Sequence, residues 1–369
     1  MAWALAESMG GRESRWRMIR SAFLALFLAS GCNILFGVDN LDYGPAAGGS
    51  GDSTGGANTG GGAAGGVGGA GSGGDGGSSS GSGGSGGTAL TPPTVLASGQ
   101  SDPWGLVVEG SYVYWAADGD GTVMRILISG GSPEILATGQ DNPCALALDA
   151  TSVYWTNCDS NGAVKRAPKV GGGPITTLAG GQDIPVSIAV DSASVFWTSF
   201  GDDSLYRYDF QGEVVTTLAQ NQNGAALLVV NDSSVFWTNN YAGTINKIFK
   251  AGGTPDVLAL DQDDPLGIDI DDQNVYWTDS GAGTVNQHSL SGGTNSLVAA
   301  GQDGCAGIAV DDDHVYWTAA GGVVRRAPIG GGAITTMAIG QLRPLRIALD
   351  DQNVYWTDAD AGTVMMVAK

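Results

Sequence analysis

An all-β fold of seven similar units is predicted by three regularities in the chain of 369 residues. Tryptophans recur every 39 to 42 residues, an acidic or amide residue stands six positions before each, and large apolar and small residues alternate between them, as in residues 186–190. Period-two alternation indicates strands. A repeat of ~40 residues with four short strands is typical of a β-propeller blade, so we predict a seven-bladed β-propeller. The marker residues are Trp115, Trp155, Trp197, Trp237, Trp277, Trp317 and Trp356.

Each repeat divides into four predicted strands. An inner strand such as residues 187–190 ends at a turn that begins with Asp191, and the second strand follows at 195–198. Asp and Asn side chains favour such turns because they bond to their own backbone. The third and fourth strands resemble residues 244–248 and 175–179, separated by a turn rich in glycine.

The ends of the repeat array predict how the ring closes. The seventh repeat stops after its third strand, residues 363–367, whereas residues 94–97 have the character of a fourth strand. Gly99 and Gln100 follow that segment, just as a Gly-Gln pair follows the fourth strand of the first repeat. We therefore expect residues 94–97 to complete the last blade, which removes exposed sheet edges.

The N-terminus is predicted to be an export signal. Four arginines between residues 12 and 20 precede a short apolar run at 22–29, which is too short for a membrane span. Ala29, Ser30 and Gly31 directly before Cys32 resemble the lipobox of bacterial lipoproteins. That resemblance implies a lipid on Cys32 and an anchor in the outer membrane, on its periplasmic or surface side. The alternative is an ordinary signal peptide with an incidental thiol, and translation starts at Met1 or Met18.

Three regions follow from these features. Residues 1–32 form the signal peptide up to the lipidated cysteine, residues 33–90 form a Gly/Ser-rich linker, and residues 91–369 form the propeller. A Gly/Ser tract buries too little apolar surface to fold, so we expect a disordered tether. The head is expected to be monomeric and to meet the membrane only through its lipid.

The charge balance excludes one class of partner. The chain has 16 basic and 37 acidic residues and a formal net charge of −21. Nucleic-acid binding needs clustered Lys and Arg, so we predict no nucleic-acid partner.

The second strand of the repeats carries a recurring motif. It reads Tyr-Trp-Thr-Asp at residues 276–279 and 355–358, with close variants in the other repeats. This resembles the YWTD β-propeller of the low-density lipoprotein receptor family. The resemblance implies that the aromatic residues pack between blades and that loops and rims recognise a ligand.

Candidate ligand-binding residues lie in the loops and in the central channel. The loops that join second to third strands, and fourth strands to the next blade, are rich in Asp and predict an acidic face. Trp104 is the single aromatic residue at its position in the seven repeats, and we consider both a ring projecting at the channel mouth and simple packing. Asp269 and Arg346 interrupt the small residues of the inner strands, so both are candidates within the channel.

Short fragments of calcium-loop spacing occur on the acidic face. Asn157, Asp159 and Asn161 alternate before a glycine, and Asp118 with Asp120 is a shorter fragment. None has the distant bidentate Glu, so solvated turns are the competing interpretation. We expect no cofactor, with calcium as the open possibility.

Three cysteines remain beside Cys32. Cys144 precedes an inner strand and Cys158 follows the neighbouring antiparallel strand, which places them nearly opposite each other. We predict a disulfide between them, which export favours, and a packed free thiol at Cys305.

The function predicted from these features is a non-enzymatic binding or display propeller. Its acidic loop face would engage an unidentified protein, a glycan or a cationic ligand at the bacterial envelope. The alternative is a calcium-dependent, lactonase-like hydrolase with its site in the central channel. A structural envelope component without a discrete ligand is the third possibility.

Overall fold

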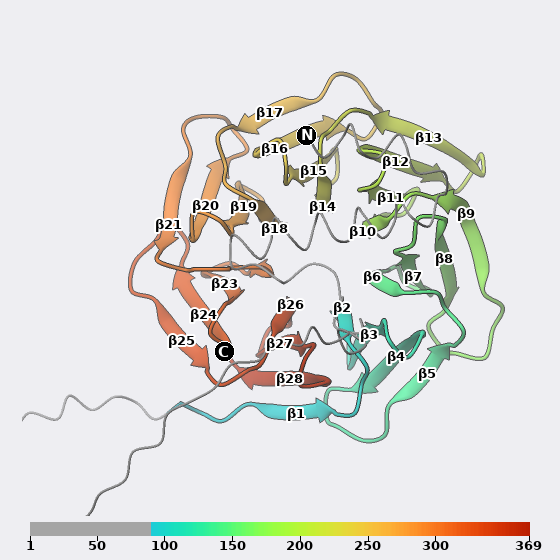
Figure 1. Ribbon diagram of the computed structural model, residues 1–369, viewed down its shortest axis with the longest axis horizontal. Coiled ribbons are helices and arrows are strands. Elements are labelled where there is room, and N and C mark those ends of the chain that lie inside the picture. Colours follow the sequence, from blue (N-terminus) through green and yellow to red (C-terminus); the bar gives the residue numbers. More distant parts are fainter. Residues whose placement is uncertain (1–89) are drawn as a thin grey trace, which may run out of the picture. The chain divides into compact units, whose positions relative to one another are not determined.

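Seven four-stranded antiparallel sheets surround a central channel in the computed structural model, which describes residues 90–369 (Figure 1). The all-β, seven-bladed propeller predicted from the sequence is confirmed. The predicted signal peptide, Cys32 and the linker up to residue 89 lie outside the described residues. Within the described part, no helix is long and apolar enough to cross a membrane.

Each blade contains an inner strand beside the channel, two middle strands and an outer strand. We number the blades 1 to 7 in the order of their inner strands along the chain. The inner strands are β2 (Pro103–Glu109), β6 (Pro143–Leu148), β10 (Pro185–Val190), β14 (Ala225–Val230), β18 (Pro265–Ile270), β22 (Ile308–Val310) and β26 (Pro344–Leu349). The second strands are β3 (Tyr112–Ala117), β7 (Ser152–Asn157), β11 (Ser194–Ser199), β15 (Ser234–Asn239), β19 (Asn274–Asp279), β23 (His314–Ala319) and β27 (Asn353–Asp358).

The third and fourth strands lie farther from the channel. The third strands are β4 (Thr122–Leu127), β8 (Gly162–Pro168), β12 (Ser204–Asp209), β16 (Thr244–Phe249), β20 (Thr284–Ser289), β24 (Val323–Pro328) and β28 (Thr363–Ala368). The outer strands are β5 (Glu134–Ala137), β9 (Thr176–Gln182), β13 (Val214–Ala219), β17 (Asp256–Ala259), β21 (Ser296–Ala300), β25 (Thr335–Ala338) and β1 (Thr94–Ala97).

Blade 7 is completed by the N-terminal strand of the ring, as predicted. Its order is β1-β28-β27-β26, and β1 pairs antiparallel with β28, with Thr94 opposite Met366. The amide of Gln100 then donates to the carbonyl of Gly362 at 3.0 Å. Two segments from opposite ends of the propeller sequence therefore share one sheet.

The marker tryptophans form the core between blades. All seven are fully buried. Six of the indole groups donate to the side chain of a glutamine 15 residues earlier, as Trp277 does to Gln262 at 2.7 Å; in blade 4, Trp237 donates to Asn239 instead. The glutamine before the inner strand thus gives the buried indole N–H its partner in six blades, and burying such a donor without one is costly.

The threonine of the motif connects neighbouring blades. Thr278 donates its hydroxyl to the carbonyl of Ala306 in the next blade at 2.9 Å and accepts from the amide of Gly267 at 2.8 Å. A Cβ on Gly267 would overlap that same carbonyl, so the close approach of the two inner strands requires glycine there. The same hydroxyl-to-carbonyl bond joins blades 3 to 4, 4 to 5, 6 to 7 and 7 to 1.

Candidate functional site: the central channel and the acidic loop face

The inner strands of all seven blades line a cavity of about 390 Å³ in the central channel. Most of the residues that line it are Leu, Ile, Val, Ala or Gly, and their backbone polar groups contribute to the surface as well. The charged residues among its lining are Asp269 on β18 and Arg346 on β26, which is where the sequence predicted them.

Both carboxylate oxygens of Asp269 accept hydrogen bonds from backbone amides. Oδ1 accepts from its neighbour Ile270 at 2.9 Å, and Oδ2 accepts from the amide of Val310, on β22 of the next blade, at 2.8 Å. Burial raises the pKa of Asp269 to about 7, although these two hydrogen bonds oppose the shift. Asp269 is therefore a bridge between blades 5 and 6 that titrates near neutrality.

Arg346 has a different environment. Its backbone amide donates to Thr357 at 3.3 Å, but its guanidinium makes no hydrogen bond, ion pair or ring contact with any residue of the described part. Burial lowers the pKa of Arg346 to about 10, with no acidic group nearby to oppose it. No ion pair joins Arg346 to Asp269 in residues 90–369, so the two channel charges act separately.

Trp104 packs inside the ring and does not project at the channel mouth. Its side chain is 9% exposed and lies in a small cluster with Cys144, Leu345 and Ala359. Of the two alternatives considered for Trp104, the structure shows simple packing, in which the small cysteine and alanine side chains lie against the indole. The Nε1 of Trp104 is buried and has no hydrogen-bond partner among the described residues.

One end of the propeller carries the acidic loop face, which we define as the loops from second to third strands and from outer to inner strands. Adjacent strands are antiparallel, so these loops share one end of the sheets. Residues 98–102, 118–121, 138–142, 158–161, 183–184, 200–203, 220–224, 240–243, 260–264, 280–283, 301–307, 320–322, 339–343 and 359–362 form it. Within these loops the single Lys or Arg is Arg343, which pairs with Asp102 at 2.9 Å and with Asp360.

The carboxylates of blade 5 repel one another on this face. Burial raises the pKa of Asp264, the hydrogen bond from Asn240 opposes the rise, and the charges of Asp263 and Asp279 add to it. Tyr241 lies beside them on the acidic loop face with 45% of its surface exposed. Burial raises the pKa of Tyr241 as well, and the charges of Asp264 and Asp203 contribute to the shift. A cation bound there would relieve this repulsion.

The residues of the calcium-loop fragments hold loops in place. Asp120 accepts from the amide of Ser101 at 2.8 Å, and Asp159 accepts from the side chain of Asn142 at 2.8 Å. Asn157 is buried at the end of β7, whereas Asn161 is exposed. Asp118 lies in the β3–β4 loop, where its amide donates to the carbonyl of Asp102 at 3.1 Å. Within residues 90–369, no group of three or more His, Cys, Asp or Glu side chains is arranged to hold a metal ion.

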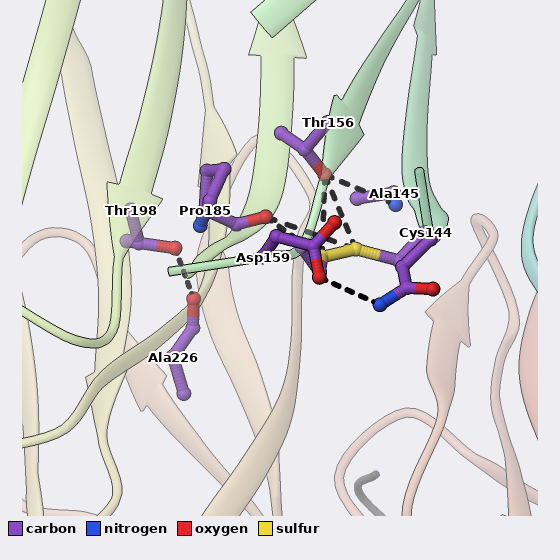
Figure 2. The surroundings of a disulfide bond; sticks show 9 residues. Cys144, Ala145, Thr156, Asp159, Pro185, Thr198 and Ala226 are labelled. Carbon is purple, nitrogen blue, oxygen red and sulfur yellow. Dashed lines mark hydrogen bonds between the residues drawn. A yellow bond between two sulfur atoms is a disulfide. The ribbon is translucent and has the colours of Figure 1, made fainter. Parts of the chain in front are cut away.

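A disulfide joins Cys144 at the start of the blade 2 inner strand to Cys158 after the second strand, with the Cα atoms 6.2 Å apart (Figure 2). The hydroxyl of Thr156 lies 3.4 Å from the Cys144 sulfur and accepts from the amide of Ala145 at 3.2 Å. Cys305 forms no disulfide within residues 90–369, and its buried thiol donates to the carbonyl of Asp279.

No protein-family model matches the sequence, and no protein of curated function matches it. Solved structures share its architecture. A catalytically inactive virginiamycin B lyase from Staphylococcus aureus, solved with quinupristin, is 15% identical over 75% of this chain and 98% of its own, with a TM-score of 0.65. The WD40 propeller domain of Doa1 is 13% identical over 75% and 96%, with a TM-score of 0.63, and the computationally designed protein Ika8 is 18% identical over 74% and 98%, with a TM-score of 0.58.

These similarities correct one prediction. The sequence predicted that the protein is not an enzyme and gave a hydrolase only as the alternative, but solved structures that share its fold include an enzyme, the streptogramin B lyase, which is 14% identical with a TM-score of 0.64. The same ring of sheets therefore supports catalysis as well as binding, and the fold does not favour the non-enzymatic prediction. At these identities, what this chain shares with the solved structures is the β-propeller fold.

Proposed function

We propose that the propeller binds a cationic ligand, most simply a Lys- or Arg-rich segment of a protein, on its acidic loop face. The observation that carries the proposal is the imbalance of charge there: many carboxylates and one basic side chain, Arg343, which is already paired with two of them. A surface of one sign attracts ligands of the other sign and speeds their association.

The exposed ring of Tyr241 marks the part of the face that suits such a ligand best. The charges of Asp264 and Asp203 act on Tyr241, and together with burial, which is the larger cause, they raise its pKa. Asp263 adds in the same way to the pKa of Asp264, which burial also raises. A Lys or Arg side chain stacked on an aromatic ring gains a cation–π contact beyond its ion pairs. Ligand recognition by loops is also what the YWTD resemblance implies, and we keep that relationship as part of the proposal.

The proposal also includes where the protein is located, which is the outer membrane of the cell. A lipid on Cys32 and the linker after it would hold the acidic loop face away from an outer-membrane surface, where basic segments of envelope proteins are accessible. Mass spectrometry of the protein extracted from membranes would test the lipid at Cys32.

The binding proposal is tested with a fluorescent oligolysine peptide. We expect saturable binding whose affinity falls steeply between low and physiological salt. Two variants carry the same charge change on opposite faces: Asp203→Asn with Asp263→Asn on the acidic loop face, and Asp272→Asn with Asp312→Asn in exposed turns at the other end of the sheets. The first pair should weaken binding about tenfold, as the loss of ~1.4 kcal/mol would.

The control pair distinguishes a site from general attraction. If Asp272→Asn with Asp312→Asn weakens binding as much as the loop-face pair, the peptide senses only the net charge and the proposal fails. Tyr241→Ser adds a second test, because it removes the ring without changing any charge, and it should weaken binding of the same peptide several-fold.

A further inference from the structure

Arg346 differs from every other basic side chain that the structure describes. The other Lys and Arg residues each have an ion pair, a hydrogen bond or an aromatic ring as a partner. Arg343 pairs with Asp102, Lys165 donates to Gln140 at 3.1 Å, and Lys247 lies over the ring of Phe236. The other basic residues that have such a partner are Arg125, Arg166, Lys169, Arg207, Lys250, Arg325, Arg326 and Lys369.

The position of Arg346 in the repeat directs it into the channel cavity. The equivalent residues of the other six blades are Gly, Ala, Ser or Leu, and all of them line the same cavity. Where the residue is Ser187, its hydroxyl reaches only as far as the amide of Leu228 in the next blade. The much longer arginine therefore brings a full charge to a place where the other blades bring small or apolar side chains.

No anion of the described chain compensates this charge. Asp269 is the one acidic residue among the cavity lining, and both of its oxygens accept backbone hydrogen bonds between β18 and β22. A partly buried guanidinium without an anionic partner is costly, because desolvation disfavours the charged form. The lowered pKa of Arg346 reports that cost.

The remaining lining defines what else a ligand would meet. Leu106, Leu146, Ile188, Ile268 and Ile347 are among the residues that line the cavity, which at about 390 Å³ falls within the range of small-molecule sites. A guanidinium binds carboxylates through two parallel hydrogen bonds, and aliphatic walls favour a hydrocarbon body. We propose that the central channel is a binding site for a small organic acid, with its carboxylate on Arg346 and its apolar body against the Leu and Ile side chains. This site is separate from the proposed cation site on the acidic loop face.

Octanoate is a suitable probe, and 1-octanol is its neutral counterpart. Calorimetric titration of the full chain should show one octanoate bound per propeller. In Arg346→Gln the affinity for octanoate should fall about 10- to 100-fold, which is the range for a hydrogen bond to a charged group. Binding of 1-octanol should change little. Lys247→Gln removes the same charge from β16, away from the channel, and should leave octanoate binding unchanged.

Melting curves give an independent readout. Without a ligand, Arg346→Met should melt at a higher temperature than the wild type, because it replaces an unpaired desolvated charge with an apolar side chain of similar length. Octanoate should then raise the melting temperature of the wild type but not that of Arg346→Met. The proposal is overturned if wild-type protein binds no octanoate, or if octanoate binds equally well to folded Arg346→Gln or Arg346→Met. An equal loss in Lys247→Gln would also overturn it.

Discussion

The hydroxyl of Thr357 donates a hydrogen bond of 3.0 Å to the carbonyl of Trp104, 253 residues earlier in the chain. This bond joins blade 7 to blade 1, and it is the same contact that joins most other neighbouring blades. Thr357 also accepts from the amide of Arg346. One threonine therefore satisfies two buried backbone groups at the point where the ring closes.

Thr357→Val should destabilise the propeller without changing its shape. Valine fills the same volume but leaves the Trp104 carbonyl and the Arg346 amide without their partner, which costs about 1–3 kcal/mol. Urea denaturation followed by tryptophan fluorescence measures the loss. Thr176→Val on the exposed outer strand β9 is the matched control and should be neutral within about 0.5 kcal/mol. Equal effects of the two substitutions would contradict the role of Thr357.

Deletion of residues 90–99 should destabilise the propeller by at least about 3 kcal/mol, when compared with a chain that begins at residue 90. The deletion removes β1, exposes the edge of β28 and uncovers the surface that Leu96 and Ala97 bury. The same urea titration serves as the measurement. An unchanged midpoint would show that blade 7 is stable with three strands.

Reduction of the Cys144–Cys158 disulfide should lower the unfolding free energy by about 3 kcal/mol, as expected for a closed loop of this length. Denaturation with and without reductant measures the difference, and the Cys144→Ser, Cys158→Ser double variant should lose the dependence on reductant. Cys305→Ser is the control, because this residue is not part of the Cys144–Cys158 disulfide and reductant should still act on that variant. A wild type insensitive to reductant would argue against the bond.

The pH dependence of stability should carry a contribution from Asp269. Its pKa is raised to about 7 in the folded chain, so the folded state holds a proton that the unfolded state releases near pH 4. Its contribution to stability is therefore complete below about pH 4 and is lost as the pH rises through about 7, with a slope of at most ~1.4 kcal/mol per pH unit.

Asp269→Asn should remove that slope between about pH 4 and 7, whatever it does to the overall stability. Denaturation at a series of pH values compares the two proteins.

Asp311 should contribute to stability with the opposite dependence on pH. Burial opposes the shift there, but the contacts with Lys369, two backbone amides and Tyr316 lower its pKa to about 2, so its contribution is lost only as the pH falls from about 4 through 2. A slope that persists in Asp269→Asn would assign the titration to another group.

The fold could be predicted from the sequence because the blades share local features. The Trp spacing recurs in all seven, Asp or Asn begins the inner turn in six, and a Gly-Gln pair precedes the inner strand in five, so an ambiguous blade is resolved by comparison with the others. Closure by residues 94–97 was also predictable, because a missing fourth strand at one end and a surplus strand at the other have one simple solution.

The candidate sites were harder to predict from the sequence, because they depend on residues that differ from the repeat pattern. Asp269 and Arg346 could be placed in the channel by alignment of the repeats. Their different roles could not be predicted, because those depend on whether a backbone amide from the next blade is within reach, as Val310 is for Asp269. The two alternatives for Trp104 could not be separated from the sequence for a similar reason. Its burial depends on the small neighbours Cys144 and Ala359, which come from two different blades.

The position of β1 beside β28 also constrains the order of folding. Blades 1 to 6 are each built from consecutive strands, so a growing chain can form them one after another from local contacts. Blade 7 cannot be finished until β28 has been synthesised, although β1 emerges before all other strands of the ring. Closing a loop of that length is slow compared with forming a hairpin. Until it happens, β1 and β28 have unpaired edges, so blade 7 can be completed only after every other strand of the ring has been synthesised.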